Sequence, residues 1–350
     1  MREVYRILDA NFNRAREALR VVEDCGRFAL NDPAITAMAK HMRSDLKDVL
    51  AEMPADEMVT SRDTPGDIGT ELTSPSEPTR SDLSDVARAA CKRLSEALRT
   101  IEEYSKFVSP EKVRTLERMR YDGYTLEQRV TGRLLVRTRF ADVRLYLLIS
   151  GVAAGGSVRQ LARAAIAGGA DALQLRERGL PDAMLLAVAA ELRELTDEMG
   201  RMLIINDRPD IAAIVGADGV HLGQQDLPIA EARRLLRPGA LVGRSTHSVA
   251  QAQAAVTEGA DYLGVGPVFR TDTKDAGEPQ GPQLYRAVAD AVGDVPLVPI
   301  GGINAENVSD LVDAGAVRVA VSSAVCAADD PKAAARTIRK QLPAPQAPDA

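Results

Sequence analysis

The 350-residue chain contains no tryptophan, only three cysteines, and no apolar run near the roughly 20 residues that a membrane-spanning helix needs. Cys25, Cys91 and Cys326 are scattered without metal-ligand spacing, which predicts reduced, structural thiols. The N-terminus lacks the apolar core of a signal peptide, so we expect a cytoplasmic protein with no membrane partner. The net charge is -6 and there is no basic stripe, which argues against nucleic acid as the main partner.

The first half of the chain has the period of α-helices. Apolar residues recur at intervals of three and four over 5–30, 34–53, 80–107 and 110–137, with Glu and Arg on the other face. A Pro-, Gly-, Ser- and Thr-rich stretch at 60–79 is typical of a loop. We therefore expect an all-helical domain over 1–135.

An internal repeat runs through this helical half. Glu17-Ala18-Leu19-Arg20 recurs as Glu96-Ala97-Leu98-Arg99. The matching residues further on are Glu23-Asp24 with Glu102-Glu103, and Arg27-Phe28 with Lys106-Phe107. A duplicated helical hairpin, packed as a pseudo-symmetric bundle, explains this pattern. We interpret the repeated Arg and Glu residues as salt bridges between helices.

From about residue 143 the pattern changes to short apolar runs, each followed by polar or glycine residues and then by a helical segment. Such runs are typical of a parallel sheet covered on both faces. They lie at 144–150, 170–177, 202–208, 219–224, 240–246, 261–268, 296–302 and 317–323. Eight units of this kind predict an α/β fold, a (β/α)8 TIM barrel, over 143–342. An open doubly wound sheet is the alternative, but 150–160 contains no GxGxxG in register.

Chemistry in a TIM barrel lies at the carboxyl ends of the strands. The second predicted strand ends in Gln174, Arg176 and Arg178. Alternate residues share one face of a strand, so an amide and two guanidiniums are expected at the barrel mouth together, a set suited to a diphosphate. A surface ion pair with Glu177 is the alternative, and Arg178 lies near the start of the loop.

Two aspartates follow neighbouring strands. Asn206-Asp207 ends the third strand, and Asp226 follows the fourth. Each aspartate stands two residues before a proline at a helix start, so taken singly each is compatible with a helix N-cap. Together, beside the cationic cluster, they predict a Mg²⁺ site, because Mg²⁺ is commonly held by one or two carboxylates plus substrate phosphate oxygens.

The last two strands match the recurrent phosphate site of this barrel. Gly302 lies in the IGGI segment after the seventh strand, and Ser322-Ser323 follow the eighth. Backbone N–H groups receive a phosphate monoester there, and a Cβ would block its close approach. Two turn glycines are the alternative.

The loop after the sixth strand, 265–274, carries Thr271, Thr273 and Lys274. Two hydroxyls and an ammonium within four residues form a grip for a phosphorylated ligand. A solvated loop is the alternative. In strand order this loop lies between the predicted diphosphate site and the predicted monophosphate site.

Three histidines complete the candidates. His247 follows Ser245 in a Ser/Thr-containing loop after the fifth strand, but no acidic partner marks a catalytic triad. His221, within GVHLG, is interpreted as a barrel-interior residue, and His41 as a residue on a helix surface. The predicted chemistry therefore depends on charge and position rather than on a strong base.

Seven motifs in order resemble the thiamine-phosphate synthase family over 143–341. They are ALQLRERG, LIINDRPDIA, ADGVHLGQQDLP, GRSTHS, ADYLGVGPVFRTDTK, VPIGGI and VAVSSAV. The resemblance implies a TIM-barrel transferase that uses Mg²⁺ and two small-molecule substrates. It joins 4-amino-2-methyl-5-(diphosphooxymethyl)pyrimidine to hydroxyethylthiazole phosphate, giving thiamine phosphate and pyrophosphate.

The same resemblance implies roles for individual residues. The pyrimidine diphosphate is contacted by Gln174, Arg176, Arg178, Asn206 and Lys274. Mg²⁺ is held by Asp207 and Asp226, and Ser245 lies by the reacting pyrimidine. The thiazole phosphate is received by Thr271, Thr273, Gly302, Ser322 and Ser323. Arg176, Ser245 and Lys274 are the expected catalytic residues. The family often has Lys where this chain has Arg178, so a planar fork replaces a point charge there.

The helical half is similar to an extension fused to this synthase in some bacteria. That extension is linked to the phosphorylation of hydroxymethylpyrimidine phosphate, although no P-loop or kinase Gly-rich loop is present here. Two alternatives remain for the barrel: a thiazole tautomerase that uses a histidine such as His247, and a non-catalytic sensor of thiamine precursors. The sequence leaves the oligomeric state open, a homo-oligomer included.

Overall fold

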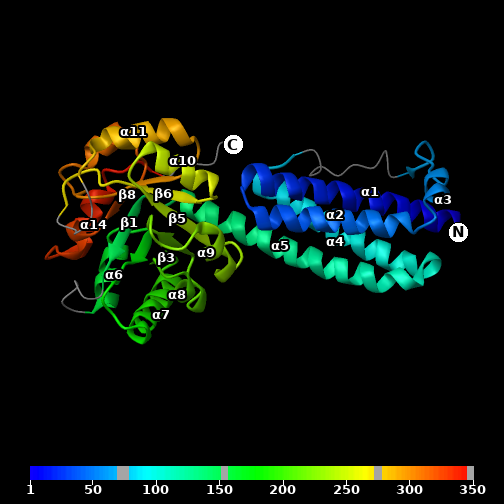
Figure 1. Ribbon diagram of the computed structural model, residues 1–350, viewed down its shortest axis with the longest axis horizontal. Coiled ribbons are helices and arrows are strands. Elements are labelled where there is room, and N and C mark those ends of the chain that lie inside the picture. Colours follow the sequence, from blue (N-terminus) through cyan, green and yellow to red (C-terminus); the bar gives the residue numbers. More distant parts are fainter. Residues whose placement is uncertain (69–78, 151–156, 272–277, 345–350) are drawn as a thin grey trace. The chain divides into compact units, whose positions relative to one another are not determined.

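The computed structural model describes residues 1–68, 79–150, 157–271 and 278–344. The chain divides into two compact units, the first Met1–Leu134 and the second beginning at Leu135 (Figure 1). The first unit is helical and the second is an α/β barrel. None of the helices in the described ranges combines the length and the hydrophobicity that a bilayer span requires.

The helical unit confirms the predicted helices and adds one. Its elements are α1 (Arg2–Asp24), a π-helical turn η1 (Cys25–Ala29), α2 (Pro33–Ala51), α3 (Ala55–Thr60), α4 (Leu83–Val108), η3 (Pro110–Lys112) and α5 (Val113–Ala141). The short helix α3 was not predicted. Helix α5 continues past the predicted end at residue 137, so its last turns belong to the second unit.

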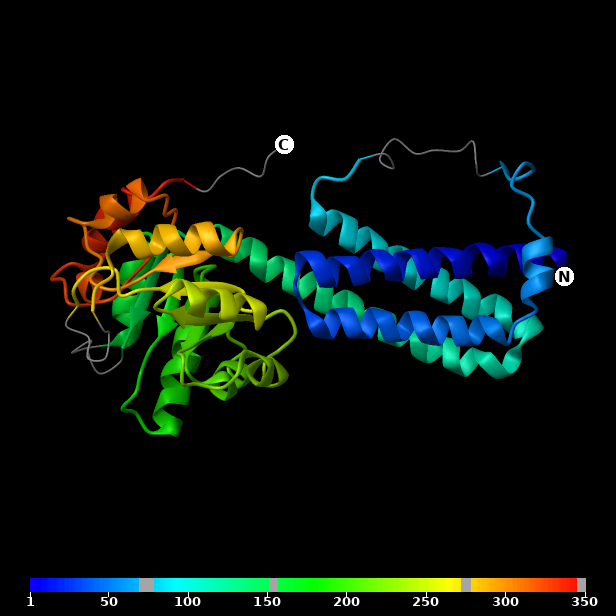
Figure 2. The ribbon, with the colours of Figure 1, turned by 45° about the horizontal axis from the view of Figure 1, so that its top comes forward.

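Aspartate caps fix where two of these helices begin. The Asp32 carboxylate accepts from the backbone N–H groups of Ala34 and Ile35, and Pro33 occupies the first helical position of α2. The Asp82 carboxylate accepts from the Asp85 N–H at the start of α4. Helix α1 packs against both α2 and α4, and the two views show the three helices running side by side (Figures 1 and 2).

The repeated charged residues form equivalent ion pairs in the two halves of this bundle. Glu23 of α1 lies 2.9 Å from Arg43 of α2, and Glu102 of α4 lies 2.6 Å from Arg120 of α5. Both glutamates are buried. The interpretation of the repeat as salt bridges between helices is therefore confirmed for the two glutamates. The repeated arginines instead pair within their own helix, Arg20 with Glu23 and Asp24, and Arg99 with Glu102 and Glu103. Arg43 and Arg120 are equivalent positions of the duplicated hairpin.

The second unit is the predicted (β/α)8 barrel. Its strands are β1 (Leu145–Ile149), β2 (Ala172–Leu175), β3 (Met202–Asn206), β4 (Gly219–Leu222), β5 (Leu241–Thr246), β6 (Tyr262–Val265), β7 (Leu297–Pro299) and β8 (Val319–Val321). They are parallel and pair in the order β7-β6-β5-β4-β3-β2-β1-β8. A parallel bridge between Ile300 and Ala320 joins the two ends of this order and closes the barrel.

Helices follow the strands and cover the outside of the barrel. They are α6 (Val158–Ala167), α7 (Asp182–Glu198), α8 (Pro209–Ile214), α9 (Ile229–Leu235), α10 (Val249–Thr257), α11 (Gly281–Val292), α12 (Val308–Asp313), α13 (Ser323–Cys326) and α14 (Pro331–Arg339). Strand residues alternate between these helices and the barrel interior. Leu147 packs outward with the helices, whereas Tyr146 and Leu148 pack inward.

The last turns of α5 cover the bottom of the barrel. Phe140 belongs to the interior cluster and lies 4.5 Å from the Tyr262 ring and 6.5 Å from the Tyr146 ring, measured between centroids. This packing explains why the helical period continues beyond residue 137. The opposite end, at the carboxyl ends of the strands, remains the mouth.

A repeated aspartate fixes the amino ends of three strands. Asp171, Asp218 and Asp261 each follow an alanine and stand just before β2, β4 and β6. Each carboxylate accepts a backbone N–H from the preceding strand, with N···O distances of 3.1 Å for Leu145, 2.9 Å for Leu203 and 2.8 Å for Val242. These bonds satisfy donors at the strand starts that would otherwise be buried without a partner.

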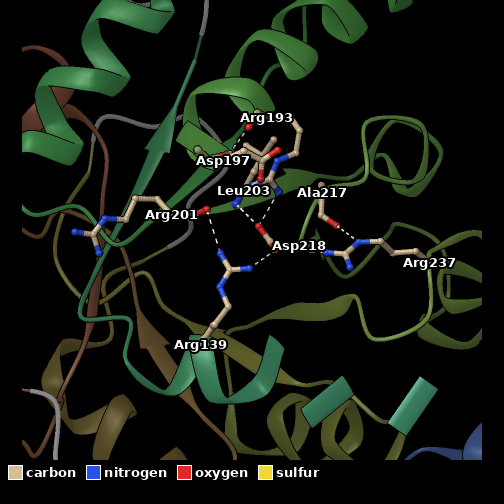
Figure 3. A network of polar contacts seen from close by, with 9 residues as sticks. Arg139, Arg193, Asp197, Arg201, Leu203, Ala217, Asp218 and Arg237 are labelled. Atoms are coloured by element: carbon tan, nitrogen blue, oxygen red, sulfur yellow. Dashed lines mark hydrogen bonds and ion pairs between the residues drawn. The ribbon is translucent and has the colours of Figure 1, made fainter. Parts of the chain in front are cut away.

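Asp218 also forms ion pairs with three arginines at this end of the barrel. Arg139 of α5 lies 2.9 Å from its carboxylate, Arg193 of α7 lies 2.8 Å away and Arg237 lies 3.4 Å away (Figure 3). The carboxylate itself is 2% exposed. The network joins four segments of the barrel unit far from the mouth, so its role is structural.

Candidate active site

The carboxyl ends of neighbouring strands bring most of the predicted polar residues to one mouth. Gln174 lies in β2, Asn206 ends β3 and Ser245 lies near the end of β5. Strand β2 ends at Leu175, so Arg176 and Arg178 lie in the loop that follows it. The Arg176 N–H still bonds the carbonyl of Ile149 in β1, at 2.9 Å, which fixes the start of that loop.

The two aspartates are not helix caps. Helix α8 begins at Pro209 after Arg208, and α9 begins at Ile229 after Pro228, and neither cap residue makes a side-chain cap bond. Asp207 has a positive φ of 62°, which turns its side chain off the line of the strand. The N-cap alternative is therefore wrong for both positions.

The Asp207 and Asp226 carboxyls face each other. Burial, a hydrogen bond to Asp226 and repulsion from the Asp226 charge raise the pKa of Asp207 to about 6, against the opposing effect of Arg178 and Arg176. The Arg178 Nε lies 3.6 Å from the Asp207 carboxylate. Glu177, in the same loop, accepts from the Ser150 hydroxyl at 2.9 Å. Two acids crowded in this way are stabilised by any cation placed between them.

This donor set fits Mg²⁺ with a phosphorylated substrate. The described residues contain no cluster of three or more His, Cys, Asp or Glu side chains arranged around a common point. Mg²⁺ does not require one, since one or two carboxylates, several waters and substrate phosphate oxygens complete its octahedron. The pKa of Asp207 is raised first by burial and then by the neighbouring Asp226 carboxyl, and a cation bound between the two carboxyls would favour their ionised forms.

A chain of hydrogen bonds crosses the barrel interior beneath the mouth. Gln174 Nε2 donates to the Tyr146 hydroxyl at 2.8 Å, and the Tyr146 and Tyr262 hydroxyls lie 2.9 Å apart. The Tyr262 hydroxyl lies 3.1 Å from His221 Nδ1. His221 Nε2 lies 2.9 Å from the Ser245 hydroxyl. The chain therefore links Gln174 to Ser245, two residues of the predicted pyrimidine site.

The donors and acceptors of these buried groups determine which group donates in each hydrogen bond of this series. The buried Tyr146 oxygen accepts from Gln174, so its own hydrogen points to Tyr262, and the hydrogen of Tyr262 then points to His221 Nδ1. Burial lowers the pKa of His221 to about 4, so the ring is neutral and its single hydrogen lies on Nε2. Ser245 consequently accepts from His221, and its own hydrogen is available to a bound substrate.

Two glycines make room for the chain. A Cβ at Gly243 would lie 2.1 Å from the Tyr262 ring, and one at Gly264 would lie 3.0 Å from the His221 ring. Tyr262 and His221 both pair in register with Gly243, so the tyrosine reaches the histidine across this gap. The prediction of His221 as a barrel-interior residue is confirmed. The two tyrosines were missed, although each interrupts an otherwise aliphatic strand.

The loop after β6 lies against the end of β7. The Val268 N–H donates to the Ile300 carbonyl and the Phe269 N–H to the Gly301 carbonyl, both at 2.9 Å. Gly302 has a φ of 65°, and a Cβ there would lie 2.2 Å from the Arg270 carbonyl oxygen. Glycine at 302 is therefore required by the approach of this loop, in addition to any ligand.

The remaining predicted site residues belong to the loop after β6 and to the segment after β8. Thr271 is the last described residue of this loop, and Thr273 and Lys274 lie outside the described residues. Ser322 and Ser323 are exposed at the start of α13, and the Ser322 hydroxyl donates to the Leu148 carbonyl at 3.0 Å. The structure thus brings β1, β6, β7 and β8 together at this side of the mouth.

His247 does not have the surroundings of a catalytic base. Its side chain is exposed, and its Nδ1 bonds the Gly266 carbonyl rather than a carboxylate. Its backbone N–H donates to Gln251 at 2.8 Å. The His247 ring is therefore positioned by a backbone carbonyl, without the acidic partner that a catalytic triad would supply among its described contacts.

Fold and site together define the class of protein. A closed parallel (β/α)8 barrel carries an acid pair, two arginines and an ordered polar chain at the carboxyl ends of its strands, which is the arrangement of a TIM-barrel enzyme. Residues 145–325 match the family model described as thiamine monophosphate synthase, and residues 6–129 match the ThiD2 family.

Curated relatives extend this match to nearly the whole chain. Thiamine-phosphate synthase of Nostoc punctiforme is 43% identical over 343 residues, 97% of this chain and 94% of its own length. The enzyme of that name from Gloeobacter violaceus is 44% identical over 328 residues, 94% of each chain. The solved structure of thiamine phosphate pyrophosphorylase from Pyrococcus furiosus is 34% identical, with a TM-score of 0.53, and covers 59% of this chain and 96% of its own. The chain belongs to the thiamine-phosphate synthase family.

Proposed function

We propose that this chain joins a pyrimidine diphosphate to a thiazole phosphate at the barrel mouth, giving thiamine phosphate and pyrophosphate. Its membership of a family of transferases supports this activity. The observation that carries the proposal is the close pair of carboxyls Asp207–Asp226, with Arg178 3.6 Å from Asp207, next to the polar chain that ends at Ser245. The tautomerase and sensor alternatives find no support among the relatives.

Each end of the mouth has a proposed ligand. Arg176, Arg178 and Asn206, with Lys274 from the loop after β6, bind the diphosphate. Thr271, Thr273, Gly302, Ser322 and Ser323 bind the thiazole phosphate. The Gln174 amide and the Ser245 hydroxyl hold the pyrimidine ring between them, because both are fixed by the buried chain.

Charge stabilisation is the proposed source of catalysis. Asp207 and Asp226 would hold Mg²⁺, which neutralises phosphate oxygens as a Lewis acid when it is bound. Arg176, Arg178 and Lys274 stabilise the diphosphate as the bond from the pyrimidine methylene carbon to oxygen breaks and both electrons leave with oxygen. The thiazole nitrogen lone pair then forms the new carbon–nitrogen bond. No side chain has to remove a proton.

The direct test is the coupling assay on the full chain. Both substrates with Mg²⁺ should give thiamine phosphate and pyrophosphate in equal amounts, and EDTA should stop both. Binding of the two substrates without release of pyrophosphate would contradict the proposal and would favour a sensor.

The hydrogen-bond chain makes a separate prediction about Tyr262. Tyr262→Phe removes the donor to His221 Nδ1, so the ring can present its hydrogen on either nitrogen and Ser245 loses its fixed orientation. Removing such a supporting hydrogen bond typically costs about 10- to 100-fold in activity. We expect kcat/KM for thiamine phosphate formation to fall by this factor, while the Mg²⁺ dependence is unchanged.

A double-mutant cycle with Ser245→Ala separates this role from a general loss of packing. If Tyr262 acts through Ser245, the Tyr262→Phe change should have little further effect once the serine hydroxyl is gone. Losses that multiply independently would show that Tyr262 acts on the barrel as a whole. The imidazole ¹⁵N shifts of His221 report the tautomer directly, and they should change in Tyr262→Phe.

For the helical half we propose a separate domain over 1–135, beside a synthase domain over 143–342. The division of the chain into two compact units between Leu134 and Leu135 supports these bounds. We further propose that the helical domain phosphorylates hydroxymethylpyrimidine phosphate, which would supply the barrel with its diphosphate substrate. The full chain, given ATP and the pyrimidine monophosphate, should form the diphosphate. If no diphosphate forms, a scaffold role is preferred.

A further inference from the structure

A groove between α1 and α2 is lined by Lys and Arg side chains that have no role in the chemistry proposed for the barrel. Its volume is about 460 Å³, and its lining includes Arg16, Lys40, Arg43 and Lys47 together with Phe12 and Leu50. None of the described residues that line it is acidic. The volume lies within the range of about 300–1,000 Å³ typical of small-molecule sites.

Only one of the four cations has an evident structural role. Arg43 lies 2.9 Å from the buried carboxylate of Glu23. Arg16 donates to the neutral Asn13 side chain at 2.8 Å, and within the described ranges no carboxylate forms an ion pair with Arg16, Lys40 or Lys47. Lys40, Arg43 and Lys47 share one face of α2 at intervals of three and four, where like charges destabilise a helix. The cluster is therefore unfavourable without an anion.

The internal repeat supplies a comparison within the same chain. Arg43 and Arg120 are equivalent, since each pairs with a buried glutamate of the neighbouring helix. By the same spacing, Lys40 corresponds to Glu117 and Lys47 corresponds to Tyr124. On the other helix of each pair, Arg16 corresponds to Ser95.

The second hairpin, formed by α4 and α5, therefore has the structural ion pair but no counterparts of Arg16, Lys40 and Lys47. If Arg16, Lys40 and Lys47 served helix packing, the second hairpin would have the same need for them. Their restriction to the first hairpin, where they line the groove, indicates a ligand, and the absence of acids among the lining residues indicates that the ligand is an anion.

We propose that this groove binds the phosphate group of a small phosphorylated ring compound. Arg16, Lys40 and Lys47 contact the phosphate, whose charge of about -1.5 to -2 three cations can balance. Phe12 and Leu50 provide an apolar side for the ring. The inference deepens the function proposed for the helical domain, because it identifies where a phosphorylated substrate would be held.

Lysine acylation of the full chain, read by peptide mass, tests this site locally. AMP serves as a phosphorylated ring compound, with inorganic phosphate and adenosine as its separate parts and with ionic strength held constant by chloride. AMP should protect Lys40 and Lys47 from acylation, phosphate should do so more weakly and adenosine should not. Lys92, exposed on α4 of the second hairpin, should react equally with and without AMP.

Arg16→Gln should raise the AMP concentration needed for protection about tenfold, since it removes one charge-assisted contact. Arg14→Gln, an equal change at an exposed position of the same helix, should leave protection unchanged. Equal protection of Lys92, or protection in Arg16→Gln at the same AMP concentration as in the parent chain, would overturn the site. Acylation does not depend on phosphate transfer, so the groove can be established even if the kinase proposal fails.

Discussion

Replacing Asp207 by asparagine is expected to lower kcat/KM for thiamine phosphate formation about a thousandfold, because a metal-stabilised leaving group is worth several kcal/mol of transition-state energy. The variant keeps the size of the side chain and removes the charge that would hold Mg²⁺ against the diphosphate. The Mg²⁺ concentration for half-maximal turnover should rise as well. Steady-state kinetics over a Mg²⁺ titration measure both quantities.

The same substitution should not destabilise the chain when Mg²⁺ is absent. Asp207 has a pKa raised to about 6 in the folded chain, so its ionisation opposes folding increasingly as pH rises from its ordinary value, near 4, through 6. Asparagine removes this penalty at neutral pH. In EDTA we expect Asp207→Asn to unfold at the same urea concentration as the parent chain or a higher one. Added Mg²⁺ should stabilise the parent chain more than the variant.

Asp210→Asn is the matched control. Asp210 lies three residues further on, pairs with Arg208 at 2.7 Å and belongs to the first turn of α8 rather than to the mouth. Its replacement should change turnover less than about twofold, because an exposed ion pair is worth about 0–1 kcal/mol. Asp207→Asn with nearly normal turnover would contradict the assignment of Asp207 to a metal site.

Much of the mouth could be predicted because barrel topology converts sequence order into position. Once eight apolar runs are recognised as parallel strands, the residues that end them share one rim. Asp207 and Asp226 could be paired in this way. The sequence alone could not decide whether each aspartate is a helix cap or a metal ligand. That choice depends on where α8 and α9 begin, and backbone geometry sets both starts.

The buried chain beneath the mouth was less accessible to sequence reasoning. His221 was expected inside the barrel, but its partners depend on Tyr262, which reaches it only because Gly243 has no side chain. Strand alternation predicts which residues face inward and does not predict which of them touch across the interior. The groove of the helical half was missed for a similar reason, since exposed Lys and Arg residues on helices are ordinary until packing gathers them.

The largest stability effect is expected from Asp218→Ala, at the end of the barrel opposite the mouth. The change leaves Arg139, Arg193 and Arg237 without their shared anion and leaves the Leu203 N–H buried without an acceptor (Figure 3). Removing one partner of a buried ion pair costs about 3–5 kcal/mol. Arg139 and Arg237 are 37% and 41% exposed, and water can solvate them, so we expect the lower value, about 3 kcal/mol.

Asp197→Ala provides the control for this loss, because it removes a carboxylate from the same arginine. Asp197 lies 2.5 Å from Arg193 but is 68% exposed, so its loss should cost less than about 1 kcal/mol. Hydrogen exchange of the β3 and β4 amides measures both changes within the barrel, independently of the helical unit. Folded Asp218→Ala should still form thiamine phosphate, since Asp218 lies at the amino ends of the strands. If Asp218→Ala and Asp197→Ala lost equal stability, the stabilisation would come from pairing the charge of Arg193 rather than from the burial of the Asp218 carboxylate.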